Sequence, residues 1–200
     1  MRMFVAVVPA DDVLEDLEEF LAPRRATAPF RWSTPEQWHL TLAFAEDVLD
    51  RTYDDLVGRL TDAAGKRRPI EASIAGGGAF PHVGRAKVLY AGVETDVQEL
   101  ERIATGARNA LSTAGVDVDG QRFRPHLTLS RMGRPVEATN WVRLLDTYRG
   151  PEWRIDELAL VASHLGVGPR RRPRHEVLET FSLGPAGSGP ARPDAPARGR

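Results

Sequence analysis

The sequence contains no cysteine, and only two of its 27 basic residues are lysines. The absence of cysteine excludes disulfides, thiol nucleophiles and cysteine-ligated zinc or iron–sulfur centres. No apolar run approaches the roughly 20 residues that a membrane-spanning helix needs. The first residues turn acidic too early for a secretory signal peptide, so we expect a cytoplasmic protein, with a monomer as the default state.

The chain also lacks an excess of either charge. Its 200 residues carry 27 Lys and Arg against 28 Asp and Glu, a formal net charge of −1. Without a global basic field, any anion must be held by local groups. The preference for arginine suits bidentate recognition of phosphate, although codon bias in a GC-rich genome is the simpler explanation for it.

Apolar periodicity predicts an α+β fold in which strands and helices alternate irregularly. Strands are expected at residues 3–8, 37–44, 70–75, 86–93, 122–130, 154–164 and 174–183. Helices are expected after a cap at Asp11 or Asp12, from about Asp50, after a cap at Thr95, and over residues 136–147. Between two of these strands, GGGAFPHVGR is expected to be a loop without the pattern of a dinucleotide or Walker site.

The composition changes sharply at the C-terminal end. Residues 184–200 contain four glycines, four prolines and almost nothing apolar. Such a segment cannot bury enough surface to fold, which predicts a disordered Pro/Gly/Arg tail. Residues 1–183 are then expected to form a single domain.

The strongest feature is a repeated tetrapeptide. Residues 39–42 read His-Leu-Thr-Leu, and residues 126–129 read His-Leu-Thr-Leu again. On a strand, side chains two residues apart point to the same face. Each copy therefore offers one imidazole and one hydroxyl on one face and two leucines on the other, and two such strands related by a pseudo-two-fold axis would face each other across a cleft.

Two histidines and two threonines on opposite walls of a cleft suit displacement at phosphorus. One histidine can take a proton from the attacking oxygen while the other gives a proton to the leaving oxygen. The threonine hydroxyls can bind the non-bridging oxygens. The residues alone do not decide which histidine is the acid. A metal site is disfavoured because no carboxylate lies near His39 or His126 in a ligating pattern, so no metal and no cofactor is expected.

These motifs and their flanks resemble the 2H phosphoesterase superfamily, and most closely its RNA 2′,3′-cyclic phosphodiesterases, the 2′-5′ RNA ligases of the LigT/ThpR type. The resemblance covers residues 1–183 and rests on five stretches: MRMFVAVVP at the start, Arg31–Phe44 around the first motif, Gly78–Pro81, Phe123–Arg131 around the second motif, and the closing strands from Leu158 to Leu178.

The resemblance implies a bilobal α+β fold, with two pseudo-symmetric lobes of antiparallel sheet, outer helices and a central cleft. It implies hydrolysis of RNA 2′,3′-cyclic phosphate ends to 2′-phosphomonoesters without a metal, together with reversible 2′-5′ ligation in some members. By the same resemblance, His39 is the proton donor and His126 the proton acceptor, with Thr41 and Thr128 beside them. RNA 3′ ends or short oligonucleotides, including tRNA halves, are the expected partners, with no membrane and no obligate protein partner.

Three residues are candidates for substrate binding: Arg124, Phe44 and Arg131. Arg124 lies two residues before His126 and shares its face on a regular strand. Arg131 lies five residues beyond His126 and falls on the opposite face unless the strand bends. Phe44 could stack on a nucleobase, as aromatic residues of single-stranded RNA-binding proteins often do.

Weaker candidates have simpler structural explanations. Trp32, Phe80 and Phe123 could stack on a base but suit a core equally well, and the Arg170–Arg174 turn could contact an RNA backbone or be a solvated turn. His82 suits a solvated loop, and His164 a structural position. His175 is a departure, because relatives commonly have tyrosine there, and this puts the shape of the cleft rim and the choice of substrate in doubt.

Two alternatives remain open. The chain could be another 2H phosphodiesterase, acting on 2′-5′ oligoadenylate or a small cyclic nucleotide. It could instead be a non-catalytic module that binds RNA or nucleotides. The second alternative is disfavoured because binding alone does not require a matched acid and base.

Overall fold

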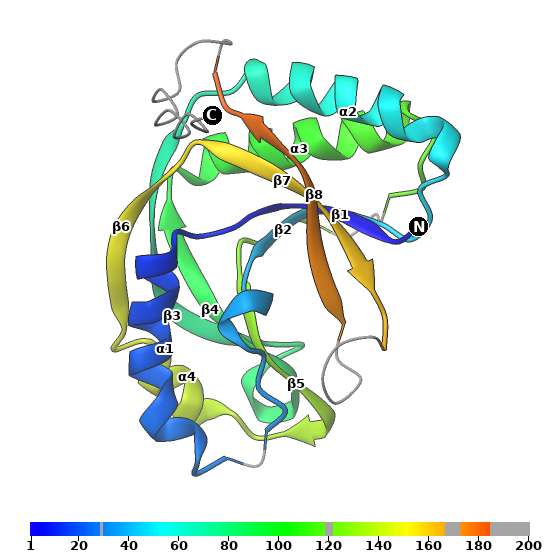
Figure 1. Ribbon diagram of the computed structural model, residues 1–200. Helices are drawn as coiled ribbons and strands as arrows, with labels where there is room; N and C mark the ends of the chain where they lie inside the picture. Colours follow the sequence, from blue (N-terminus) through cyan, green and yellow to red (C-terminus); the bar gives the residue numbers. More distant parts are fainter. Residues whose placement is uncertain (29, 119–121, 167–172, 185–200) are drawn as a thin grey trace, which may run out of the picture.

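The computed structural model describes residues 1–28, 30–118, 122–166 and 173–184. The expected tail 184–200, apart from Gly184, and most of the Arg170–Arg174 turn lie outside these residues. Within them, the α+β class is confirmed, with eight strands and four α-helices (Figure 1). None of the described helices is long and apolar enough to cross a membrane.

All eight strands belong to one antiparallel sheet in the order β6-β3-β4-β5-β2-β1-β7-β8. The strands are β1 (Met3–Val7), β2 (Leu40–Ala45), β3 (Ile70–Phe80), β4 (Ala86–Thr95), β5 (Leu127–Val136), β6 (Arg149–Ile155), β7 (Glu157–His164) and β8 (Arg174–Ser182). All five residues of β1 are buried, because this apolar strand lies inside the sheet and is covered on both faces.

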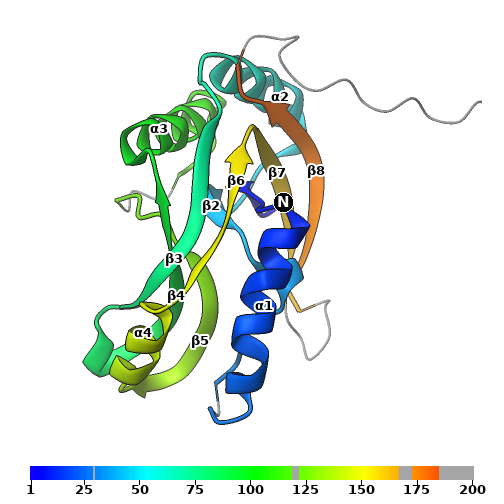
Figure 2. The ribbon, with the colours of Figure 1, turned by 90° about the vertical axis from the view of Figure 1, so that its left-hand side faces the viewer.

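The two expected lobes are the two halves of this curled sheet. One half is β6-β3-β4-β5 and the other is β2-β1-β7-β8, and they meet where Leu40 of β2 pairs with Leu127 of β5. Helices α1 (Asp11–Arg25) and α4 (Thr139–Leu145) pack on the first half, against β6 and β3. Helices α2 (Asp50–Gly65) and α3 (Val97–Thr113) lie side by side on the second half (Figures 1 and 2).

Two helix caps differ from the sequence-based expectation. Helix α1 begins at Asp11 but its N-cap is Ala10, so the two aspartates lie in the first turn, where their charge favours the positive end of the helix dipole. Helix α3 is capped by Asp96, whose side chain accepts a hydrogen bond of 3.1 Å from the backbone N–H of Glu99. Thr95 was expected to be this cap, but it is the last residue of β4.

The glycine-rich segment Gly76–Phe80 is not a loop. It continues β3, because the absence of side chains lets neighbouring groups approach closely. A Cβ atom on Gly77 would lie 2.6 Å from Leu145 Cδ1, and one on Gly78 would clash with the hydroxyl oxygen of Tyr90. Glycine is therefore required here by packing within a strand.

Both repeat-bearing strands begin later than expected. Strand β2 starts at Leu40, after a short 3-10 helix at Pro35–Gln37, and β5 starts at Leu127 and runs to Val136 instead of occupying 122–130. This extension of β5 also shortens α4 at its N-terminal end. As a result, each motif histidine directly precedes its strand, at the edge of the regular hydrogen-bonded ladder.

Two apolar clusters lie on the two faces of β1. Met3, Val5 and Val7 belong to the main core. On the other face, Phe4 and Ala6 form a small cluster with Ala159 and Val161 of β7, and Phe44 packs against it. This second cluster forms the floor beneath the first motif.

Candidate functional site

The register between β2 and β5 brings the two motifs together. Leu40 is directly opposite Leu127 in an antiparallel pair. If this register is continued by one residue in each direction, His39 falls opposite Thr128 and Thr41 opposite His126. Residues directly opposite each other have Cβ atoms about 4.5–5.5 Å apart and share one face. This register therefore favours the same side of the sheet for all four polar side chains.

All four side chains line a single cleft of about 1610 Å³. Its wall also contains six arginines, and only three acidic residues, from the described part of the chain. The arginines are Arg2, Arg31, Arg108, Arg122, Arg124 and Arg131, and the acidic residues are Glu46, Asp47 and Asp117. The described lining of the cleft is thus locally basic in a chain of net charge −1.

A bulge in each repeat brings a further residue into the cleft. The pairing of β1 with β2 skips Leu42, and the pairing of β4 with β5 skips Leu129, which is the same position of the two tetrapeptides. A bulge of one residue reverses the alternation beyond it. Phe44 and Arg131, each five residues after its histidine, consequently line the cleft rather than the opposite face.

His126 is held by its backbone and by two aromatic rings. Its Nδ1–H donates to the backbone carbonyl of Arg124 at 2.7 Å, which leaves Nε2 as the nitrogen with a free lone pair in the neutral ring. Phe80 and Tyr90 contact the ring edge-on, at centroid distances of 5.1 and 5.3 Å. Burial lowers the pKa of His126 below its ordinary value, partly opposed by the hydrogen bond to Arg124.

His39 lies in an equivalent aromatic setting. Its ring stacks on Phe4 at 4.5 Å and meets the ring of His175 edge-on at 5.1 Å. Burial, followed by repulsion from His175, lowers the pKa of His39 to about 3, while a backbone hydrogen bond with Gln37 acts in the opposite direction. At neutral pH and without a bound anion, His39 is therefore uncharged.

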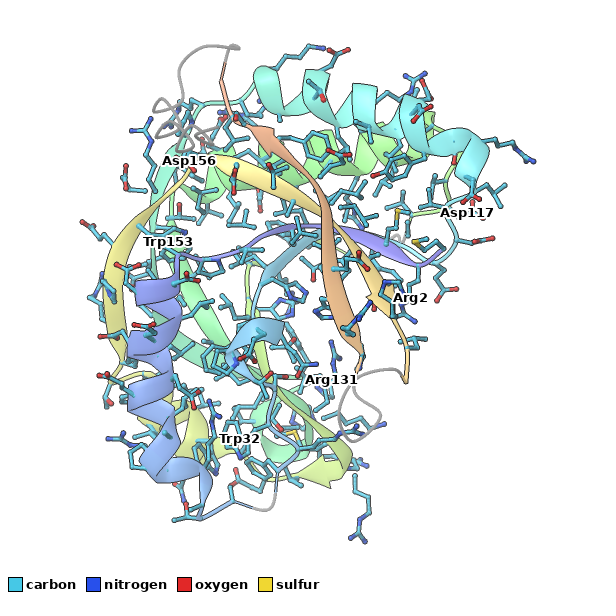
Figure 3. All side chains as sticks on the ribbon, in the orientation of Figure 1. Arg2, Trp32, Asp117, Arg131, Trp153 and Asp156 are labelled. Atoms are coloured by element: carbon cyan, nitrogen blue, oxygen red, sulfur yellow. The ribbon has the colours of Figure 1, made fainter. Side chains whose placement is uncertain are left out.

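Two arginines approach each other at one side of the cluster. The guanidinium of Arg2 lies over the ring of Phe44, 4.5 Å from its centroid. The pKa of Arg131 is lowered by partial burial and by the positive charge of Arg2. Figure 3 shows both arginines near the lower part of β8. Arg131 also opposes protonation of both motif histidines, so its charge acts on the centre of the cleft.

The other candidates divide between the cleft and the rest of the molecule. Arg124 lines the cleft from the segment before β5, with its guanidinium 5.8 Å from the ring of Phe80. Phe123 lines the cleft and is half-buried. Trp32 borders the cleft, but it is 8% exposed and packs with Phe30 and Trp141 in the core.

Three candidates lie outside the cleft wall. Phe80 supports His126 from behind, stacked on Tyr90 at 4.5 Å. His82 is exposed and directly precedes the short 3-10 helix Val83–Arg85. The ring of His164 forms a hydrogen bond of 3.0 Å with the carboxylate of Glu176. Arg174, at the end of the basic turn, forms an ion pair with the same carboxylate at 3.6 Å.

Phe4, Arg2 and His175 were not predicted as site residues, yet all three line the cleft. Phe4 belongs to an apolar run that reads simply as a buried strand. His175 lies on β8, which is far from both motifs in the sequence and reaches them only through the order β2-β1-β7-β8. The one sequence feature that pointed to His175 is that relatives commonly have tyrosine at this position.

The donor set offers no obvious metal centre. The described residues contain no group of three or more His, Asp or Glu side chains placed to hold a metal ion. The polar groups that line the cleft include imidazole, hydroxyl and guanidinium groups.

The chain is similar to known proteins over most of its length. A sequence model of the 2′-5′ RNA ligase superfamily matches residues 13–166. The RNA 2′,3′-cyclic phosphodiesterase of Thermus thermophilus is 30% identical over 187 residues, which cover 92% of this chain and 90% of that protein. The RNA 2′,3′-cyclic phosphodiesterase of Aquifex aeolicus is 28% identical, covering 92% of this chain and 98% of that protein.

Solved structures give the same fold. The crystal structure of TT0787 from Thermus thermophilus superposes with a TM-score of 0.75 at 28% identity, covering 93% of this chain and all of that one. The E. coli LigT complex with 3′-AMP has a TM-score of 0.73 at 22% identity, covering 91% of this chain and 97% of that chain. The chain belongs to the 2′-5′ RNA ligase superfamily.

Proposed function

We propose that this protein hydrolyses the 2′,3′-cyclic phosphate at RNA 3′ ends to a 2′-phosphomonoester. The observation that carries the proposal is the register of Leu40 against Leu127, which sets His39 and His126 on one face of the sheet within a basic cleft. Relatives that match over most of the chain bear the name of this activity.

In the proposed step, water attacks phosphorus and the bond from phosphorus to the 3′ oxygen breaks. His126 takes the role of base that the family resemblance implies, and its geometry suits that role: its Nδ1–H is committed to the Arg124 carbonyl, so the Nε2 lone pair is free to take the proton of water. His39 is the acid that protonates the departing 3′ oxygen. The product carries a 2′-phosphate and a 3′-hydroxyl.

His39 needs a proton for this role, and it is uncharged in the free site. A phosphodiester anion bound between the motifs favours the charged form of the imidazole, because an opposite charge within about 4–6 Å raises its pKa. Substrate binding therefore raises the pKa of His39, so that His39 can hold the proton that it later donates. Thr41 and Thr128 donate hydrogen bonds to the non-bridging oxygens, and Arg131 balances their charge.

No metal has a role in this step, since the two imidazoles account for both proton transfers. The decisive experiment is incubation of the purified protein, in EDTA, with a short RNA ending in 2′,3′-cyclic phosphate. Identification of the product by mass and phosphatase-coupled chromatography should give a 2′-phosphate. A 3′-phosphate would reverse the orientation of the substrate, and loss of activity in EDTA would contradict the metal-independent mechanism.

Ligation is the second candidate. In this reaction the 5′-hydroxyl of an RNA takes the place of water and attacks the cyclic phosphate, while the bond from phosphorus to the 3′ oxygen breaks and a 2′-5′ bond forms. His126 is again the base and His39 the acid, and they exchange roles when the 2′-5′ bond is cleaved back to the cyclic phosphate. The superfamily to which the chain belongs carries that name. A gel assay with an added 5′-hydroxyl RNA, tRNA halves included, should detect a joined product that the same enzyme cleaves again.

A further inference from the structure

His175 is a third histidine in the cleft, beside the two of the repeat. His39, Phe4 and His175 form a closed set of ring contacts, with centroid distances of 4.5, 5.1 and 5.1 Å. Both imidazoles meet at an interplanar angle of 77°, edge to face. His39 arrives from the edge of β2, Phe4 from β1 and His175 from β8, so the sheet fixes the set from three strands.

The surroundings of His175 make a positive charge unfavourable. Its Nδ1 atom is buried and has no hydrogen-bond partner among the described residues. Its neighbour Glu176 is engaged elsewhere, with His164 at 3.0 Å and Arg174 at 3.6 Å. Burial lowers the pKa of His175 below its ordinary value.

The charges facing His39 are all positive when they are present. They come from His175 on β8, from Arg131 on β5 and from His126 immediately before β5. Phe4, from β1, offers no charge. Two imidazoles about 5 Å apart, with no acidic side chain among the described residues recorded as opposing their repulsion, interact strongly enough to titrate as a pair rather than independently.

We propose that His175 is a positioning residue that forms a one-proton pair with His39, so that His39 takes up its proton when the anionic substrate binds. This inference rests on the proposed function and deepens it. A proton on either ring opposes a proton on the other. His39 therefore becomes protonated only when a bound anionic ligand offsets this repulsion. The substrate class that this pair selects is an anionic phosphodiester.

The test is an NMR titration of the histidine Cε1–Hε1 signals with saturating inorganic phosphate as the anion. His175→Phe keeps the edge contact and removes the charge. It should raise the pKa of His39 by about half a pH unit or more, the size expected for two charges 5 Å apart even in water. His175→Asn provides a second uncharged variant in case the first fails to fold.

The effect must be reciprocal, because linkage between two sites is symmetric. His39→Gln should therefore raise the pKa of His175 by the same amount that His175→Phe raises the pKa of His39. His164→Gln is the matched control, since it removes a histidine from the same β7-β8 hairpin that does not line the cleft. It should leave the titration of His39 unchanged.

A kinetic readout connects the pair to catalysis. In His175→Phe, the alkaline limb of kcat should move to higher pH by the shift seen in the NMR titration, because this limb reports loss of the proton from the acid in the bound complex. Unchanged titrations of His39 in both His175 variants would overturn the proposal. If the NMR shifts occur but the enzyme turns over no cyclic phosphate, the pair stands and the proposed function fails.

Discussion

Leu40 and Leu127 face each other across the junction of the two half-sheets, and this one pair sets the geometry of the whole site. Both leucines are fully buried, so their side chains fix which face of each strand points into the core. The residues on either side of them must then point into the cleft. A slip of one residue in this register would send both histidines toward the core, where a charged imidazole has no solvation.

Removal of either histidine tests the division of labour. His39→Ala and His126→Ala should each lower kcat by about 10²–10⁴-fold, the usual contribution of a general acid or base. Circular dichroism should show the fold retained. His82→Ala serves as the control, because this exposed histidine lies outside the cleft. Wild-type turnover in both site variants would contradict the two-histidine mechanism.

The threonines should act on the transition state more than on binding. Thr41→Val and Thr128→Val preserve shape and remove the hydroxyl. Loss of one donor to a developing oxyanion costs about 10²–10³-fold in kcat. Steady-state kinetics should show kcat falling with little change in KM, whereas a rise in KM alone would assign these hydroxyls to ground-state binding.

Arg131 should contribute binding energy through its charge. Arg131→Gln is expected to raise KM and to weaken its dependence on salt, because one fewer cation contacts the substrate phosphate. Arg134→Gln, on the same strand but outside the cleft wall, is the matched control. Equal salt dependence of KM in the two variants would place Arg131 away from the phosphate.

Stability should depend on pH through His39. Its pKa is about 3 in the folded protein and near 6.5 when unfolded, so the unfolded chain binds more protons between these values. The contribution is fully present above pH 6.5 and is lost as the pH falls toward 3, at up to about 1.4 kcal/mol per pH unit. Urea unfolding of wild type and His39→Gln at several pH values isolates this contribution, and parallel curves would show that His39 titrates normally.

The glycine-rich part of β3 offers a test that joins packing to the site. Gly78→Ala would push a methyl group into the ring of Tyr90, which contacts His126. We expect a loss of about 1–3 kcal/mol in the free energy of unfolding, together with lower kcat. Gly58→Ala in α2, where no atom lies within 4 Å of the added carbon, should instead stabilise the protein by up to about 1 kcal/mol.

The sequence by itself determined the chemical elements of the site. The two copies of His-Leu-Thr-Leu, with their alternation of polar and apolar side chains, were enough to predict two strands that present His39, Thr41, His126 and Thr128 together. Helix positions followed from apolar periodicity because amphipathic packing is a local pattern. Strand ends and helix caps were less well predicted, since Thr95 and Asp96 can both cap a helix and only the extent of β4 decides between them.

Only the tertiary structure decided the rest. Regular alternation sends Phe44 and Arg131 away from the cleft, and the bulges at Leu42 and Leu129 that bring them back are visible only in the pairing with β1 and β4. The contact of His175 with His39 depends on the order of four strands in the sheet. Local patterns fix which face of a strand is buried, whereas long-range pairing fixes which residues from distant strands meet.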